Sequence, residues 1–527
     1  MTRFFDFDDI VVGAGAAGVP MAVRLSEDPA RRVALVEAGP YYPTASETPA
    51  DLLNANMMSL FQHDWHTSAQ ALDGRVIRFP RGRVVGGSSA VGNTVALRAV
   101  PADFDQWAKN GIPEWSWEEV LPLYRRIEDD LDFGGEYHGK GGPIPIRRFP
   151  TEEMTPRQSH FLQACLDQGF PWVEDQNHPD ATGVGAMPSN RRDATTRVST
   201  SMGYLPAARG RENLTIIPAT LVNKVLIRDG RAYGVELVDG PRPRVRWWRR
   251  ATSTVQLTAR RVILAAGTVG TPSVLLRSGI GPAEDLRRLG LPVKSDLPGV
   301  GAGLNDHPRT GLFMTPKPGT QTPGEPSGQT VLRTTSAGSD DPNDIHYYMV
   351  NGFNLTQQFP QLQHLPGHDR IFGVMIVDQL PHARGRVSLT STDPRESPHI
   401  ELNYLSDERD YRTFVDGMRT AWELMNTPAI RALGEEFVMV DESVMASEEA
   451  LRDYVRRTID STYNAVGTAK MGPSSDPASV VDQYGAVYGV EALYVADASI
   501  MPTHVRANTN LTSIMIGERV ADLLRGT

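Results

Sequence analysis

The first forty residues alternate hydrophobic runs with a glycine-rich break. Residues 10–12 are hydrophobic, an Ala- and Val-rich stretch follows the glycines as far as Leu25, and residues 33–36 form a second hydrophobic run that ends at Glu37. Short apolar runs bounded by turn residues indicate buried strands, and a longer apolar stretch between them indicates a crossover helix. The pattern therefore predicts that the chain begins with a strand–helix–strand unit.

The same patterns predict elements farther along the chain. Hydrophobic positions at helical spacing predict helices over 115–131, 407–425, 448–458 and 512–524. Alternating or continuous apolar runs predict two strands in 213–239 around Asp229-Gly230, a buried strand over 262–266 and strand structure over 487–500. Proline, glycine and polar residues predict a loop-rich segment over 40–80, a domain crossing over 134–147 and a loop or lid over 316–345.

Composition and charge narrow the class of protein. The chain has 527 residues, of which 40% are hydrophobic, so it is long enough for several domains with a sizeable core. Its net charge is −10, which opposes non-specific nucleic-acid binding. One basic run, residues 242–250, contains five arginines around Trp247 and Trp248. It is either a patch for an anionic partner or a hairpin tip with solvated arginines, and the acidic chain favours the hairpin.

Cysteine content and the N-terminus bear on location. Cys165 is the one cysteine, so an intrachain disulfide and a cysteine-based zinc site are both excluded. Residues 1–9 are aromatic and acidic and lack the basic and apolar regions of a signal peptide. Since the sequence has no apolar run of about 18 residues, no membrane span is expected. We expect a cytoplasmic protein.

The glycine-rich break has the spacing of a dinucleotide-binding motif. Gly13, Gly15 and Gly18 form G-x-G-x-x-G between the first strand and the first helix. These glycines permit a tight turn, close approach of a pyrophosphate and close helix–strand packing. Glu37 ends the second strand, where a carboxylate can bind ribose hydroxyls. The motif favours a dinucleotide over an ordinary glycine turn, but it does not distinguish FAD from NAD.

Later clusters resemble the glucose–methanol–choline (GMC) oxidoreductase family. Residues 82–89 (GRVVGGSS) and 267–281 (GTVGTPSVLLRSGIG) resemble its two signatures. Residues 497–502 with 508–510 resemble its C-terminal flavin segment, residues 463–472 the segment that carries its catalytic base, and residues 384–405 a strand and turn of its substrate domain. The resemblance implies an α/β fold with a Rossmann-like FAD-binding domain (1–150, 190–310 and 465–527). It also implies a substrate-binding domain (150–190 and 310–464) built on an antiparallel sheet.

The motif and the resemblance together predict the FAD site. Val222 is implied as an adenine contact and Asp497 as a contact of the ribityl or pyrophosphate part. The predicted contacts are Gly13, Gly15, Ala16, Ala17, Gly18, Glu37, Ala38, Arg83, Gly86, Gly87, Ser88, Asn93, Thr94, Val222, Tyr463, Asp497, Ala498, Asn508 and Thr509.

Two absences refine the cofactor prediction. Residues 90–94 contain no histidine, and in family members with covalently attached flavin a histidine lies in this loop, so non-covalent FAD is expected. The glycines at 299, 301 and 303 lack the spacing of a second dinucleotide motif. Without a site for NAD(P)H, electrons are expected to pass from the flavin to oxygen or another acceptor.

The catalytic segment departs from the family. The family has a histidine base where this chain has Asn464, and the partner position is Asn508. An amide can orient a hydroxyl or stabilise an oxyanion, but it cannot act as a general base near neutral pH. Three explanations stay open: His504 takes the proton, the chain is a variant from which the base was removed, or the reaction needs no base. His504 as a plain loop histidine is a fourth reading, and His307 resembles a structural turn of the family.

The sequence thus predicts a FAD-dependent enzyme with Asn464, Asn508 and His504 as candidate catalytic residues. The predicted reaction oxidises the CH–OH group of a small alcohol by hydride transfer to flavin N5. The alternatives are a lyase or decarboxylase on the same scaffold, or a protein that has lost its base. The expected partners are a small-molecule substrate and oxygen or another electron acceptor, with no nucleic acid, membrane or metal ion.

Overall fold

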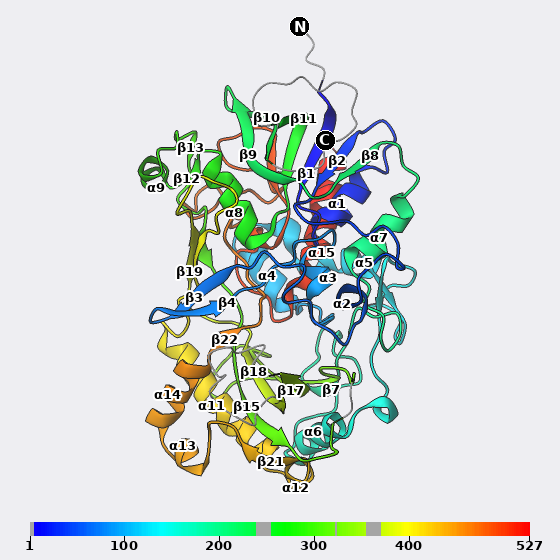
Figure 1. Ribbon diagram of the computed structural model, residues 1–527, viewed down its shortest axis with the longest axis vertical. Coiled ribbons are helices and arrows are strands. Elements are labelled where there is room, and N and C mark those ends of the chain that lie inside the picture. The colour runs from blue at the N-terminus through cyan, green and yellow to red at the C-terminus, as the bar shows by residue number, and fades with distance from the viewer. Residues whose placement is uncertain (1–4, 239–254, 322–323, 355–369, 527) are drawn as a thin grey trace.

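The computed structural model describes residues 5–238, 255–321, 324–354 and 370–526. Its elements divide between an upper and a lower part in Figure 1, each built around a large sheet. The basic run at 242–250 lies outside the described residues. The predicted fold class, α/β with a second antiparallel sheet, is confirmed.

The upper sheet contains the N-terminal βαβ unit. β1 (Phe7–Val12) pairs in parallel with β2 (Val33–Val36) on one side and with β11 (Val255–Leu264) on the other. The strand order is β8–β2–β1–β11–β10–β9, with β23 (Leu493–Val495) also parallel to β11. β8 (Leu214–Ile217) is parallel to β2, whereas β9 (Leu221–Arg228) and β10 (Arg231–Val238) form an antiparallel hairpin.

Helices surround this sheet and bury its hydrophobic side chains. α1 (Gly18–Leu25) packs against the C-terminal helix α15 (Thr509–Arg525) and against α7 (Thr200–Ala208). Chain segments more than 480 residues apart therefore meet beside β1 (Figure 1). The other helices of this part are α2 (Ala50–Leu53), α3 (Ser88–Val91), α4 (Pro101–Lys109), α5 (Trp117–Ile127), α8 (Gly267–Arg277) and α9 (Ala283–Arg288).

The lower sheet is antiparallel. Its order is β21–β15–β18–β17–β16–β7, and β22 (Asp460–Ser461) pairs with β15. The strands are β15 (Pro308–Pro316), β16 (Thr330–Thr334), β17 (Ile345–Asn354), β18 (Arg370–Asp378), β7 (Gly183–Ala186) and β21 (Gly434–Phe437). α6 (Pro156–Asp167) and α11 (Glu408–Met425) cover one face, and α12 (Pro428–Arg431), α13 (Glu442–Ala446) and α14 (Glu448–Thr458) complete this part.

Side chains along the strands of the lower sheet alternate between its two faces. Leu332, Tyr347 and Ile376 join the hydrophobic cluster beneath α6 and α11. Their neighbours Val331, Tyr348 and Val377 point the other way and join the cluster of the upper sheet. Because strand side chains alternate between faces, Arg333 and His346 lie on the face that looks toward the upper sheet.

Smaller sheets accompany the two large ones. One has the order β14–β19–β20–β3–β4, from Ala302–Leu304, Gly385–Ser388, His399–Glu401, Ser68–Leu72 and Arg75–Arg78. The others are β5 (Glu128–Asp130) with β6 (Ile144–Ile146), and β12 (Ile280–Gly281) with β13 (Ser295–Asp296). The predicted domain boundaries stay a prediction.

Most predicted elements are present, with two clear differences. The helices predicted over 407–425 and 448–458 are α11 and α14, and Asp229 and Gly230 form the β9–β10 turn with φ of 51° and 74°. The segment 40–80 was expected to be loop-rich, but it contains α2 and the β3–β4 hairpin. The expected loop over 316–345 contains β16, because its apolar residues Val331 and Leu332 are buried in the lower sheet.

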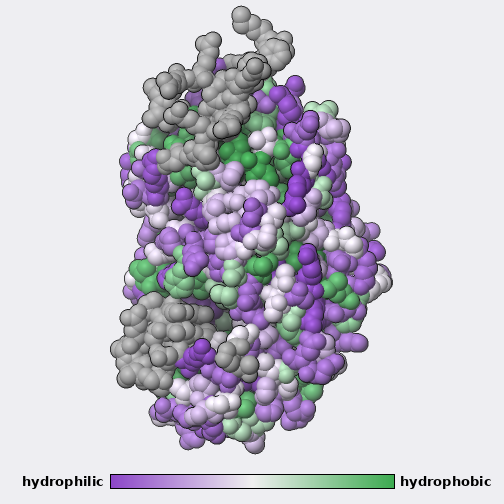
Figure 2. Space-filling view, turned by 45° about the vertical axis from the view of Figure 1, so that its right-hand side comes forward, coloured by the Kyte–Doolittle hydropathy of each residue, from purple (hydrophilic) through white to green (hydrophobic). Residues whose placement is uncertain are grey.

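The coloured part of the face drawn in Figure 2 is mainly hydrophilic. On the face in Figure 2, hydrophobic residues occur in separated groups among hydrophilic ones. Among the described residues, no helix combines the length and apolar character needed to cross a membrane.

Candidate active site

A cavity of about 520 Å³ opens at the carboxyl ends of the central parallel strands. Val12 and Val36, the last residues of β1 and β2, and Ala265, which follows β11, lie in its wall. In open α/β sheets, ligands bind at this edge, where strand order reverses. The cavity is therefore the candidate cofactor site.

Most of the predicted cofactor residues line this cavity. The lining includes Gly13, Gly15, Ala16, Ala17, Glu37, Ala38, Arg83, Gly87, Ser88, Val222, Tyr463, Asp497, Ala498 and Thr509. Gly18, Gly86, Asn93, Thr94 and Asn508 are not part of it, and neither are Asn464 and His504. The structure thus brings the motif, the first signature and the C-terminal segment together around one space.

Gly18 and Gly87 allow close packing of the backbone, whereas Gly15 leaves space for a ligand. A Cβ atom on Gly18 would lie 1.9 Å from the Gly13 carbonyl oxygen, so Gly18 allows the helix to pack on the turn. Gly87 has φ of +51°, and a Cβ there would lie 2.6 Å from Cα of Gly15. A Cβ on Gly15 would have only Gly87 within 4 Å, at 3.8 Å, and Gly15 itself lies in the cavity wall.

Three helices present their N-termini to the cavity. Ala17 precedes α1, Gly267 begins α8 and Thr509 begins α15, and all three residues are in the wall. Free N–H groups and the helix dipole favour negative charge at such ends. The cavity therefore fits a dinucleotide with its pyrophosphate, and the residues present suit FAD.

The two predicted carboxylates also brace the cavity wall. Glu37 accepts hydrogen bonds from the backbone N–H of Ala14 (2.9 Å) and Gly39 (2.8 Å), and burial raises its pKa to about 7. Asp497 accepts from the Gly267 N–H (2.9 Å) and the Thr271 hydroxyl (2.6 Å). Each carboxylate therefore holds loop backbone in place beside the ligand space.

Several lining residues were not predicted. They are Val12, Val36, Trp65, Thr67, Arg81, Gly82, residues 219–221, residues 265–270, Ser273, Val274, Arg277, residues 394–398, Ala465 and Ser513. Residues 267–281 resemble the second signature of the family, so part of the set had a sequence signal. Residues 394–398 lie between β19 and β20, and nothing local in their sequence indicates a cofactor.

Asn464 lies beside His307, whose hydrogen bonds fix the orientation of the amide. Nε2 of His307 lies 3.0 Å and 3.1 Å from the carbonyl oxygens of Gln379 and Val505, so Nε2 carries the hydrogen. Burial lowers the pKa of His307 well below its usual value, which leaves Nδ1 as an acceptor. Nδ2 of Asn464 donates to that Nδ1 at 3.3 Å.

The remaining hydrogen bonds of the Asn464 side chain use the second amide hydrogen and one lone pair of the oxygen. Nδ2 donates its second hydrogen to the Thr462 hydroxyl at 3.1 Å. Oδ1 accepts from the Thr509 hydroxyl at 3.4 Å, and Thr509 is part of the cavity wall. Since an amide oxygen has two lone pairs, Oδ1 can accept one further hydrogen bond.

His504 holds the main chain of Asn464. Its Nε2 donates to the Asn464 carbonyl oxygen at 3.0 Å, and its Nδ1 accepts from the Val505 N–H at 3.0 Å. Burial lowers the pKa of His504 to about 3. Both ring nitrogens are therefore engaged and the ring is neutral, an arrangement that suits positioning better than proton uptake.

Asn508 is the N-cap of α15 and contacts the lower sheet. Its Oδ1 accepts from the Tyr348 hydroxyl at 3.3 Å, and that hydroxyl lies 3.1 Å from Nδ1 of His346. Nδ2 of Asn508 has no hydrogen-bond partner within the described ranges. Asn464 thus offers an acceptor and Asn508 a donor, the two functions that complement a hydroxyl group. The sequence did not indicate Tyr348 or His346, because only strand pairing brings them here.

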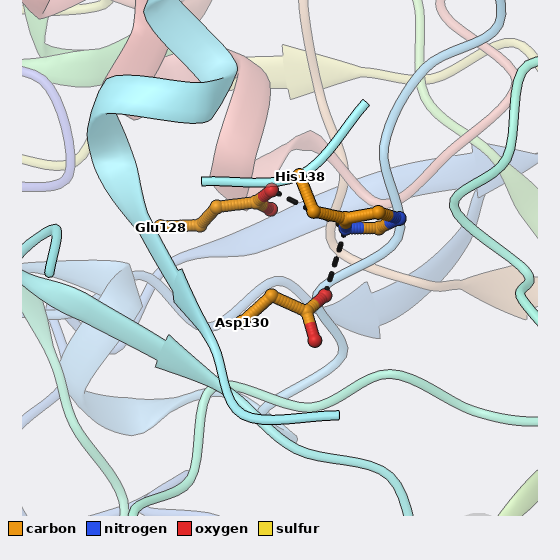
Figure 3. Close-up of side chains that lie close together, drawn as sticks. All are labelled: Glu128, Asp130 and His138. Carbon is orange, nitrogen blue, oxygen red and sulfur yellow. Dashed lines mark ion pairs between the residues drawn. The ribbon is translucent and has the colours of Figure 1, made fainter. Parts of the chain in front are cut away.

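Glu128, Asp130 and His138 form a second cluster, drawn in Figure 3. Nδ1 of His138 lies 2.9 Å from Asp130 and 3.4 Å from Glu128, and Nε2 lies 2.8 Å from Asp175. Burial opposes the charged ring, but its bonds to Asp130, Asp175 and Glu128 raise the pKa of His138 to about 10.

This cluster is an ion-pair network. Arg98 pairs with Glu128 at 2.8 Å, and Arg148 pairs with Asp130 and Asp175 at 2.9 Å each. A metal ion needs a deprotonated histidine and would face two guanidinium groups. The charges therefore balance without a metal.

Comparison with known proteins covers both halves of the chain. Residues 7–309 and 381–517 match the N-terminal and C-terminal models of a family described as GMC oxidoreductase. An uncharacterised GMC-type oxidoreductase of Rhodococcus erythropolis is 34% identical, and the match covers 100% of both chains. Choline oxidase of Arthrobacter globiformis is 35% identical over 99% of this chain and 94% of its own.

Solved structures agree with the fold. Pyridoxine 4-oxidase from Mesorbium loti superposes with a TM-score of 0.88 at 27% identity, over 99% of this chain and 100% of that chain. A formate oxidase superposes with a TM-score of 0.87 at 24% identity, over 100% and 99% of the two chains.

Proposed function

Because the chain belongs to the GMC oxidoreductase family of FAD-dependent enzymes, we propose that it oxidises a small alcohol between Asn464, Asn508 and the cofactor cavity. The observation that supports this site is the opposed polarity of the two amides. Oδ1 of Asn464 accepts from the substrate hydroxyl, and Nδ2 of Asn508 donates to the same oxygen. FAD, when bound, accepts the hydride released from the carbinol carbon.

The chain's own residues hold the substrate hydroxyl in one orientation. His307 fixes the side-chain amide of Asn464, and His504 fixes its main chain. Tyr348 orients Asn508 by donating to its oxygen. When the hydroxyl is held in this way, the C–H bond of the carbinol carbon is restricted in direction. This restriction lowers the entropic part of the activation barrier to hydride transfer. Because the pair contains no side-chain base, the hydroxyl proton passes to solvent water as the carbinol carbon loses its hydride, and the product is the aldehyde or ketone.

The charge on the face of the lower sheet that looks toward the upper sheet favours neutral or anionic alcohols as substrates. Arg309, Val377, His346 and Arg333 form one cross-strand row on the face toward the upper sheet. Asp460 pairs with Arg309 at 2.8 Å, whereas Arg333 has no ion pair among the described residues. His346 is neutral because burial lowers its pKa, so Arg333 carries the net positive charge of this row and would repel a cation such as choline, which the names of several relatives contain.

A matched pair of substrates tests both parts of the proposal. 3,3-Dimethylbutan-1-ol has the shape of choline without its charge. Under air, the holoenzyme should oxidise the neutral alcohol faster than choline, with the aldehyde as product. Oxygen consumption, compared with reduction of an artificial acceptor, separates an oxidase from a dehydrogenase. Preference for choline would contradict the charge argument, and turnover of no alcohol in a broad panel would contradict the reaction.

A further inference from the structure

Arg277 lies in the wall of the cofactor cavity with most of its hydrogen-bond donors unused. It is the last residue of α8, and only 8% of it is exposed. Its Nε donates to the carbonyl oxygen of Asn223 at 2.8 Å, whereas Nη1 and Nη2 have no hydrogen-bond partner within the described ranges. Burial lowers the pKa of Arg277 to about 10, so the group is a cation near neutral pH. Buried donors without acceptors are costly, which points to an acceptor on a ligand in the cavity.

A short series of contacts connects Arg277 to the ribose end of the dinucleotide motif. Glu37 is the carboxylate that the motif assigns to the ribose, and its carbonyl oxygen accepts from the Thr220 N–H at 2.8 Å. Thr220 leads into β9, where Val222 is the adenine contact that the family resemblance implies. Asn223, the next residue, holds Arg277. Arg277 therefore lies at the adenosine end of the cavity.

The other end of α8 lies beside the candidate catalytic pair. The Thr268 hydroxyl, in the first turn of the helix, donates to the carbonyl oxygen of Ala465 at 3.0 Å, and Ala465 follows Asn464. Beyond the first turn, the wall residues of α8 are Gly270, Ser273, Val274 and Arg277. Their three- and four-residue spacing means that one face of the helix lines the cavity. Because α8 has 11 residues, it separates Arg277 from the catalytic end by about 16 Å.

The segment between β19 and β20 joins the wall beside Arg277. Residues 394–398 line the same cavity, and α8 contacts both β9 and β19, which belong to different sheets (Figure 1). Asp393, which precedes the segment, accepts from the Arg395 N–H at 3.0 Å, and its charge acts on Arg277. Pro394 and Pro398 restrict the backbone at both ends of the segment. The adenosine end is thus bounded by two regions that are distant in sequence.

We propose that Arg277 and residues 394–398 bind the adenosine half of FAD and make the site selective for this dinucleotide over FMN. A guanidinium group can donate to the ring nitrogens of adenine or stack on its face, and both modes use the groups that Arg277 leaves unbonded. The proposal concerns binding of the cofactor, so it does not depend on the reaction at Asn464 and Asn508.

Arg277→Met removes the donors while keeping a long side chain. Full-length protein from which the flavin has been removed is titrated with FAD and with FMN, which lacks the adenosine half. The dissociation constant for FAD should rise about 10–100-fold, the factor expected for hydrogen bonds from a charged donor, and that for FMN should stay at the wild-type value. Arg287→Met is the control, because Arg287 is an exposed residue of α9, and it should change neither constant.

Arg277→Lys tests the same contact with a smaller change. Lysine keeps the charge and a donor but lacks the planar fork, so FAD binding should weaken less than in Arg277→Met and FMN binding should again be unchanged. This variant decides the matter if loss of the Asn223 contact prevents Arg277→Met from folding. A wild-type dissociation constant for FAD in the folded variants would overturn the proposal. An equal loss of FAD and FMN binding would also overturn it, since Arg277 would then not act on the adenosine half.

Discussion

The ring of His307 stacks on the ring of His504, with centroids 3.4 Å apart and an interplanar angle of 27°. Both rings are buried and neutral, and both hydrogen-bond to Asn464, one to its side chain and the other to its carbonyl oxygen. The stacked pair therefore contacts the amide at the position where the sequence resemblance implies the family's histidine base. The two histidines hold Asn464 in place and do not take the hydroxyl proton. Substitutions can therefore test the positioning of Asn464 and the removal of the proton separately.

Asn464→His should speed flavin reduction by alcohols. An imidazole at this position can take the hydroxyl proton, and general-base assistance is worth about 10²–10⁴-fold. Stopped-flow reduction of the flavin should show the gain, with a pH dependence near the usual histidine pKa of about 6.5. Asn464→Gln, which supplies an amide but no base, is the control and should show no gain. An unchanged rate in Asn464→His would mean that loss of the proton does not limit the reaction.

His504→Ala should slow flavin reduction without changing its pH profile between pH 5 and pH 9. His504 has a pKa of about 3, so it does not titrate in that range, and its loss frees the Asn464 carbonyl oxygen. His504→Gln, which retains a donor, should recover part of the rate. If His504 were the base, the wild-type profile would contain an ionisation that disappears in His504→Ala.

Gly87→Ala should abolish FAD retention. Gly87 has φ of 51° and ψ of −141°, a sparsely populated backbone conformation that costs a residue with a side chain about 1–3 kcal/mol, and the new Cβ would lie 2.6 Å from Cα of Gly15. Gly210→Ala is the matched control, because a Cβ there has nothing within 4 Å. The ratio of flavin to protein absorbance after purification measures the effect. A folded Gly87→Ala protein with full flavin content would contradict the position of the pyrophosphate.

Removal of His138 should destabilise the fold in a pH-dependent manner. The pKa of His138 is about 10 in the folded state and about 6.5 in an unfolded chain, so its contribution to stability is complete below pH 6.5 and is lost as pH rises through 10. His138→Gln should lower the free energy of unfolding by about 3–5 kcal/mol near pH 6. The difference from wild type, measured by denaturant unfolding, should shrink toward pH 10. A difference that is constant across this range would show that His138 is not a buried cation.

The cofactor cavity was largely predictable, whereas its surroundings on the lower sheet were not. Gly13, Gly15 and Glu37 lie close in sequence within one βαβ unit, so their spacing in the sequence predicts how they are arranged in space. Tyr348 and Arg333 reach the site only through the register of β16, β17 and β18, which depends on pairing between distant segments. The β3–β4 hairpin had a signal in Asp73-Gly74 between alternating residues, and the surrounding polar composition obscured it.

Anaerobic mixing of the holoenzyme with an alcohol tests the proposed oxidation. The visible flavin absorption should bleach as one equivalent of aldehyde or ketone forms, and bleaching should slow when deuterium replaces hydrogen on the carbinol carbon. The slower rate would identify C–H cleavage as part of flavin reduction. Product formed without bleaching would contradict alcohol oxidation in favour of a lyase or decarboxylase, and bleaching by no alcohol would contradict it in favour of a protein that has lost its catalytic base.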